Sequence, residues 1–116
     1  MRYSNACVRN MENELYRIRY TPLAFEDLDG IDTYISETLC NAVAAERLIE
    51  QMEKSINQLK QFPYMGSKVE DEYLAAKGYR KLVVENYLIF HLIDEPQREV
   101  IIMRVIYGAR EYHNLL

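Results

Sequence analysis

Several side chains in the last third of the chain could stabilise an anion or transfer a proton. Guanidinium groups stabilise negative charge that develops in a transition state, and imidazole or phenol groups act as general acids and bases. The candidates lie where a sheet and the tail that follows it could bring them together: Arg80, Arg104, Tyr107, Tyr112 and His113. Each also has a structural explanation, because arginines decorate half-exposed strands and a tyrosine ring adds buried area to a core.

Other groups with potential reactivity have simpler explanations. The two cysteines, Cys7 and Cys40, are too few for a disulfide framework and lack metal-ligand spacing, so both are expected to be reduced. His91 stands between Phe90 and Leu92 in an apolar run. This position favours a structural histidine with satisfied hydrogen bonds over a catalytic one.

An acidic run, Glu70, Asp71 and Glu72, precedes Tyr73. Runs of like charge usually lie on solvated loops, and contact with a partner or target is the functional alternative. A metal site is disfavoured because the carboxylates are adjacent rather than convergent and no histidine is near. The sequence therefore predicts neither a metal nor a cofactor.

The elements that must position the candidate side chains are three apolar runs between Tyr79 and Tyr107. Asn86 separates the first two runs, and residues 94–98 separate the second from the third. Short runs rich in Val, Ile, Leu and aromatic residues between turn formers predict strands, and such short connections allow only antiparallel neighbours. The middle run, Tyr87 to Ile93, is apolar at nearly every position, so both of its faces should be covered.

The front of the chain predicts a strand followed by two helices. Residues 15–20 alternate with period two, which indicates a half-buried strand. Thr21 and Pro22 fit a helix start, and apolar residues recur at spacings of three and four up to Leu39. Asn41 can cap a second helix that ends before Phe62, and the connection is so short that the helices should lie antiparallel.

The predicted fold is α+β: a helical hairpin packed on one face of a four-stranded antiparallel sheet, in the order β-α-α-β-β-β. Residues 15–116 form this single domain, and residues 1–14 are expected to be a disordered or non-essential tail. Residues 67–78 are the least regular part of the interior. A connection of this length in a small domain is expected to be functional or mobile.

Composition limits the classes of protein to which the chain can belong. No apolar run approaches the roughly 20 residues needed to span a bilayer, and no segment has the pattern of a signal peptide, so a cytoplasmic protein without membrane contact is expected. The formal net charge of −4 argues against a nucleic-acid binder, because phosphate contacts need a basic surface. Local basic patches around individual arginines remain an alternative.

Four segments carry a resemblance to a known family: YRIRYTPLAFEDLDGIDTYI, QLKQFPYMG, GYRKLVVENYLIFHLID and VIIMRVIYGARE. In their order and spacing they resemble the RelE/ParE toxins of bacterial type II toxin–antitoxin modules, over nearly all of residues 15–112. The resemblance implies a growth-inhibiting toxin that is held inactive by a cognate antitoxin. One branch of the family consists of ribosome-dependent endonucleases that cut messenger RNA, whereas the ParE-like branch inhibits DNA gyrase and is not enzymatic.

The residues that match the nuclease branch form an incomplete set. Arg110, two residues after Gly108, matches the position of a catalytic arginine in the RelE-like pattern. Leu88 stands where an arginine is expected early in the central strand, and Leu116 stands where a terminal tyrosine is expected. The incomplete set and the acidic net charge favour ParE-like inhibition of DNA gyrase.

Two alternatives stay open. The chain could be a metal-independent, ribosome-dependent endoribonuclease with these catalytic residues: Arg80, Arg104, Tyr107, Arg110 and His113. It could also be an inert relative that only binds an antitoxin. Under every interpretation, the unpaired strand edges and the groove of the helical hairpin can each bind a segment of another protein. We therefore expect the antitoxin to add along a sheet edge or to pack against the helices.

Overall fold

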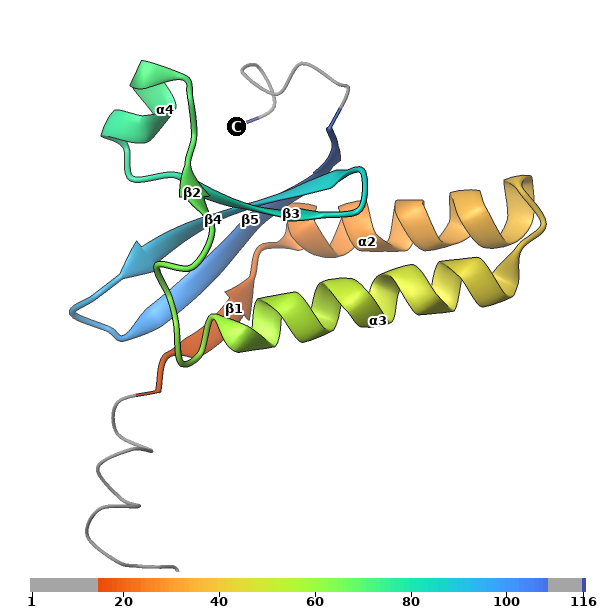
Figure 1. Ribbon diagram of the computed structural model, residues 1–116, viewed down its shortest axis with the longest axis horizontal. Coiled ribbons are helices and arrows are strands. Elements are labelled where there is room, and N and C mark those ends of the chain that lie inside the picture. The colour runs from red at the N-terminus through yellow and green to blue at the C-terminus, as the bar shows by residue number, and fades with distance from the viewer. Residues whose placement is uncertain (1–14, 109–115) are drawn as a thin grey trace, which may run out of the picture.

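A long helical hairpin lies across one face of a five-stranded sheet in the computed structural model, which describes residues 15–108 and Leu116 (Figure 1). The hairpin consists of α2 (Pro22–Thr33), the π-helical turn η1 (Tyr34–Thr38) and α3 (Ala42–Gln58). The other elements are β1 (Arg17–Tyr20), β2 (Ser67–Lys68), α4 (Glu72–Ala76), β3 (Arg80–Val84), β4 (Tyr87–Asp94) and β5 (Glu99–Tyr107). The tail predicted over residues 1–14 lies outside the described residues.

Both helices begin where the sequence predicts. The hydroxyl of Thr21 accepts a hydrogen bond from the backbone N–H of Ala24 at 3.1 Å, and Pro22 occupies the first turn of α2. The side chain of Asn41 accepts a hydrogen bond from the N–H of Ala44 at 3.1 Å and caps α3. Each cap satisfies a backbone donor that has no partner within its own helix.

Replacing Asn41 with alanine is expected to lower the free energy of unfolding by about 1 kcal/mol, because the N–H of Ala44 loses its acceptor. Asn41→Ser keeps a capping oxygen and should lose much less. Urea denaturation of the three proteins measures both differences. Equal losses for the two variants would contradict the capping role.

The sheet has the order β1-β5-β4-β3-β2. The predicted antiparallel meander of β3, β4 and β5 is confirmed. The edges differ from the prediction: β1 pairs with β5 in parallel, from Arg17 opposite Glu99 to Tyr20 opposite Ile102. Most of the chain separates these two strands, so nothing forces them to be antiparallel, and periodicity identifies a strand without giving its neighbour or its direction.

The fifth strand, β2, comes from the segment predicted to be irregular. Its two residues pair antiparallel with the start of β3. Gly66 makes this approach possible, since its φ is +93° and a Cβ there would lie 2.4 Å from the carbonyl oxygen of Lys81. A pairing of two residues is too short to leave a periodic signal in the sequence.

Two apolar clusters lie on opposite faces of the sheet. On the helical face, Met52 and Ile56 of α3 belong to one buried cluster with Ile89 of β4. On the other face, Leu74 of α4 belongs to a second cluster with Phe90. Ile89 and Phe90 are adjacent and fully buried, so the prediction that both faces of the middle strand are covered is confirmed.

No helix in the described part of the chain is long and apolar enough to cross a membrane.

Candidate functional site

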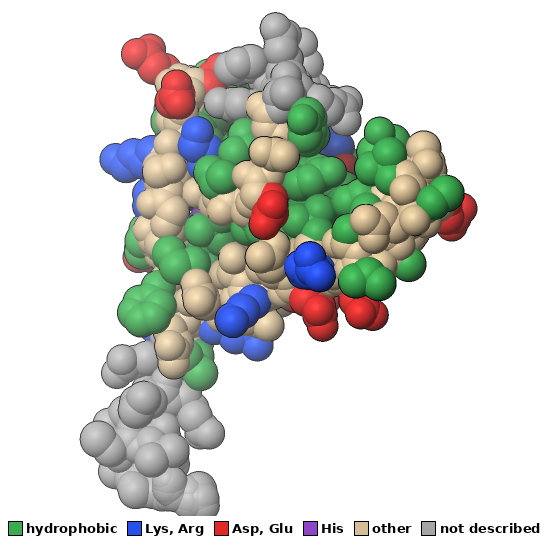
Figure 2. Space-filling model, turned by 45° about the vertical axis from the view of Figure 1, so that its right-hand side comes forward, with side chains coloured by type: hydrophobic (Ala, Val, Ile, Leu, Met, Phe, Trp, Pro, Cys, Tyr) green, Lys and Arg blue, Asp and Glu red, His purple; other side chains and the backbone are tan. Residues whose placement is uncertain are grey.

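An open groove of about 970 Å³ separates the outer half of the helical hairpin from the sheet. The hairpin is longer than the sheet beneath it, so its loop end projects past the turn between β3 and β4 (Figure 1). Apolar side chains gather in the hollow on this face of the molecule (Figure 2). We call this hollow the hairpin groove, and its apolar walls include Ile31, Tyr34, Ile35, Leu39, Tyr87 and Tyr107.

The mouth of the hairpin groove exposes aromatic and aliphatic surface. Tyr34 and Leu39 on the hairpin are 52% and 55% exposed, and Tyr107 at the end of β5 is 45% exposed. The rings of Tyr87 and Tyr107 meet edge to face with their centroids 5.6 Å apart. Contiguous apolar surface of this kind marks interaction sites in soluble proteins.

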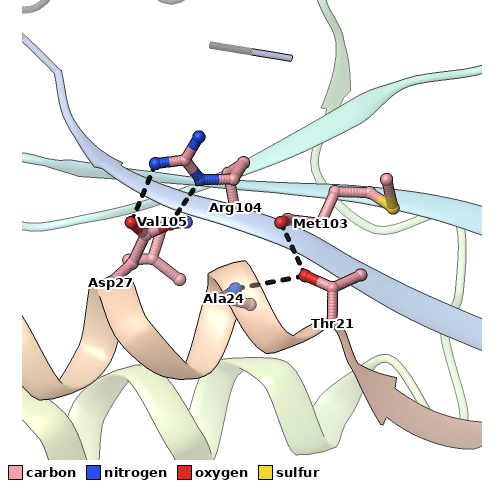
Figure 3. Close-up of polar contacts among 6 residues, drawn as sticks. All are labelled: Thr21, Ala24, Asp27, Met103, Arg104 and Val105. Atoms are coloured by element: carbon pink, nitrogen blue, oxygen red, sulfur yellow. Dashed lines mark hydrogen bonds and ion pairs between the residues drawn. The ribbon is translucent and has the colours of Figure 1, made fainter.

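An ion pair between α2 and β5 fixes one wall of the groove (Figure 3). The Asp27 carboxylate accepts hydrogen bonds from Nε and Nη2 of Arg104 at 2.7 and 2.9 Å, and from the backbone N–H of Val105 at 2.9 Å. These interactions lie beside an irregularity in the pairing of β4 with β5, where backbone groups lose their ladder partners. Asp27 raises the pKa of Arg104 through its hydrogen bond and its charge.

Thr21 ties the start of α2 to the same irregular stretch of β5. Its hydroxyl donates to the backbone carbonyl of Met103 at 2.9 Å, and its N–H donates to the carbonyl of Ile102 at 3.1 Å. One residue therefore caps the helix and also bonds the helix to the strand (Figure 3). With Asp27, it sets how the hairpin lies on the sheet.

A second cluster of interacting polar side chains lies near the start of β3. Nη2 of Arg80 donates to the backbone carbonyl of Tyr64 at 2.6 Å, and the guanidinium lies 5.5 Å from the centroid of the Tyr64 ring. The Tyr64 hydroxyl donates to a carboxylate oxygen of Glu95, and this hydrogen bond raises the pKa of Tyr64 to about 12. Arg80 thus holds the loop after α3 against the sheet.

His91 is opposite Arg80 in the ladder and is completely buried. Neither of its ring nitrogens has a hydrogen-bond partner of normal geometry among the described residues. Burial lowers the pKa of His91 to about 4, and the charge of Arg80 adds to the shift, while the backbone of Ile89 and Pro63 opposes it. The imidazole is therefore neutral at physiological pH. Its burial agrees with the prediction of a structural histidine, but the expected hydrogen-bond partners of normal geometry are missing among the described residues.

A family model described as the ParE toxin of the type II toxin–antitoxin system parDE matches residues 18–112. The chain belongs to the ParE toxin family. The match covers the sheet, the hairpin groove and both helices. The predicted resemblance to the RelE/ParE toxins is thereby confirmed.

Solved structures show the same fold as this ParE-family chain. The chromosomal ParDE toxin–antitoxin system from P. aeruginosa matches with a TM-score of 0.66 and 20% sequence identity, over 81% of this chain and 97% of that one. The RelBE2 toxin–antitoxin complex from Mycobacterium tuberculosis matches with a TM-score of 0.54 and 22% identity, over 80% and 98% of the two chains. No curated protein matches the sequence.

This ParE-family structure does not bring together the candidate catalytic residues that it describes. Arg80 is opposite His91, and Tyr107 is opposite Tyr87. The positions of His91 and Tyr87 are about 13 Å apart along β4 at the usual rise of a strand. The guanidinium of Arg104 forms an ion pair with the carboxylate of Asp27. The remaining candidates, Arg110, Tyr112 and His113, lie outside the described residues.

The acidic run has structural roles in this ParE-family chain. The side chain of Asp71 accepts a hydrogen bond from the N–H of Leu74 at 3.0 Å and caps α4. Glu70 lies 3.7 Å from the Lys81 ammonium. Within residues 15–108, no three carboxylate, imidazole or thiol side chains converge as metal ligands would.

Proposed function

We propose that the chain is the toxin of a type II toxin–antitoxin module and that it inhibits DNA gyrase in the cytoplasm. The observation that carries the proposal is the match of the ParE toxin model to residues 18–112. The resemblance assigns gyrase inhibition to the ParE-like branch, and that activity needs no catalytic constellation. The separate positions of Arg80, Arg104 and Tyr107 agree with a toxin that acts by binding.

The partner is a cognate antitoxin that places a segment in the hairpin groove. The similar structures from P. aeruginosa and M. tuberculosis are toxin–antitoxin systems. The groove offers about 970 Å³ between a helix pair and a sheet, with apolar walls and exposed Tyr34, Leu39 and Tyr107 at its mouth. An amphipathic segment fits such a groove by burying its apolar face there. The antitoxin would thereby cover surface that is costly to leave in water.

Two reactions with the purified protein test the target. The protein is added to a supercoiling reaction with gyrase and, separately, to translating ribosomes that carry a labelled message. We expect supercoiling to be inhibited and the message to stay intact. Cleavage of the message at codon boundaries, with gyrase unaffected, would replace the proposal with the endoribonuclease alternative.

A matched variant sharpens the comparison. Tyr107→Phe keeps the ring that packs against Tyr87 and removes only the phenolic hydroxyl group. We expect gyrase inhibition by Tyr107→Phe to stay within about twofold of the unmodified protein, because surface substitutions that keep packing change little. An enzyme that used this phenol as its acid or base would lose about 100-fold or more in cleavage rate.

A further inference from the structure

Glu85, in the turn between β3 and β4, has a backbone conformation that glutamate disfavours. Its φ is +56°, in the left-handed region where glycine, asparagine and aspartate are the usual residues. Backbone strain of this kind is concentrated at functional sites. The residue lines the hairpin groove and is exposed. The strained position therefore makes the Glu85 side chain a candidate for a functional role.

The turn holds Glu85 in place. The N–H of Gly108 donates to the carbonyl oxygen of Asn86 at 2.7 Å, which ties the turn to the end of β5. Within the described part of the chain, no hydrogen bond or ion pair involves the Glu85 carboxylate. The carboxylate therefore lies at the rim of the groove without a partner among residues 15–108.

The charged side chains of the described residues around the groove are mostly acidic. Among residues 15–108, the groove is lined by the carboxylates of Glu26, Asp27 and Glu85 and by one basic side chain, Arg47. Asp27 is already paired with Arg104, and the adjoining hollow adds Asp29 beside Glu26. Over the part of the chain that the structure describes, the rim therefore carries more negative than positive charge, in keeping with the net charge of −4. Such a rim favours a cationic ligand group and repels an anionic one.

The walls suit a long basic side chain. The rings of Tyr87 and Tyr107 meet edge to face, and Tyr34 on the hairpin lines the same groove. Lysine and arginine lay their aliphatic stems along apolar surface and keep the charged head in contact with polar groups. Their cationic heads also bind to the faces of aromatic rings.

We propose that the antitoxin segment in the hairpin groove is amphipathic and carries a lysine or arginine that pairs with Glu85, so that Glu85 determines which segments the groove accepts. The inference rests on the proposed toxin–antitoxin function for the identity of the partner. It is independent of whether the toxin acts on gyrase or on the ribosome. Arg47, on the opposite helix, would meet an acidic or amide group of the same segment.

A displayed library of amphipathic helices tests the charge preference. All members share one apolar face, and the polar positions beside that face are randomised between basic, acidic and amide residues. Selection on the full-length protein should enrich lysine and arginine. Selection on Glu85→Lys should enrich glutamate and aspartate. Glu72→Lys changes an exposed carboxylate on α4 outside the groove. Selection on this variant should enrich the same helices as selection on the unmodified protein.

Affinity measurements on one enriched helix complete the test. Glu85→Gln should weaken its binding by about fivefold, the upper range for a partly exposed ion pair. Tyr34→Ala should weaken binding of the same helix, because Tyr34 lines the groove. Such a loss would show that the helix binds in the groove. Glu85→Gly should raise the melting temperature, because the strain at positive φ is relieved, while it weakens binding.

Three outcomes would overturn the inference: no enriched helix, the same enrichment for the unmodified protein and Glu85→Lys, or equal affinities for Glu85→Gln and Glu72→Gln. The assay contains neither gyrase nor ribosomes. A failure of target inhibition and a failure of charge selection are therefore separate results.

Discussion

Asp27→Ala should lower the free energy of unfolding by about 3 kcal/mol, because breaking a largely buried ion pair removes its hydrogen bonds as well as its charge interaction. The side chains of Asp27 and Arg104 are only 15% and 16% exposed. Alanine at position 27 deprives Arg104 of two hydrogen bonds and the N–H of Val105 of its acceptor. The estimate is at the low end for buried pairs, since some solvent reaches both groups.

Asp29→Ala is the matched control for this prediction. It removes an exposed carboxylate from the same helix, and we expect a change within about 0.5 kcal/mol. Asp27→Asn should fall between the two variants, because an amide oxygen can still accept the Val105 N–H while the charge is lost. Urea denaturation of the four proteins measures the differences. If Asp27→Ala lost no more than Asp29→Ala, the pair would not hold the hairpin to the sheet.

The helical hairpin and the meander could be predicted because their signals are local. Thr21 and Asn41 are capping residues placed directly before apolar periodicity, and the structure uses both as caps. The apolar run of β4 required cover on both faces, and both clusters supply it. The parallel pairing of β1 with β5 joins segments about 80 residues apart, and nothing in either segment encodes the direction of the other.

The site was harder to predict because its residues act through partners distant in sequence. Arg104 is a catalytic candidate from its residue type and its place on the predicted sheet, but the carboxylate of Asp27 binds its guanidinium. The position of Asp27 in the second turn of α2 gives no sign of that role. Glu85 was missed as well. A signal existed, because a two-residue hairpin loop of Glu85 and Asn86 lacks the glycine that such loops favour, so a non-glycine residue had to adopt positive φ.

Acidification should destabilise the protein through His91, by about 3 kcal/mol between pH 6.5 and pH 4. The pKa of His91 is lowered from 6.5 to about 4 in the folded state, chiefly by burial. Between these values the unfolded chain binds a proton at this residue and the folded chain does not. Each pKa unit corresponds to about 1.4 kcal/mol, so stability is lost as the pH falls through this window and is unaffected by His91 above it.

His91→Leu isolates this contribution from the carboxylates that also titrate on acidification. Leucine fills a similar volume and removes two ring nitrogens that have no partner of normal geometry within the described residues. At pH 7 the variant should be as stable as the unmodified protein or more so, since an unpaired buried polar group is replaced by an apolar one. The difference between the two proteins should then grow in favour of the variant as the pH falls.

Urea denaturation of both proteins at a series of pH values between 7.5 and 4 measures that difference, and His113 and every carboxylate cancel because both proteins contain them. Parallel pH profiles would mean that His91 is protonated in the folded state or reaches solvent.

A direct check is the NMR titration of the imidazole, which should remain neutral to about pH 4 while the protein stays folded. Because Arg80 lies opposite His91 and opposes its protonation, Arg80→Gln should move the NMR midpoint upwards. Arg80 also donates a hydrogen bond to the backbone carbonyl of Tyr64. The same side chain therefore holds the loop at Tyr64 and lowers the pKa of the buried His91 ring.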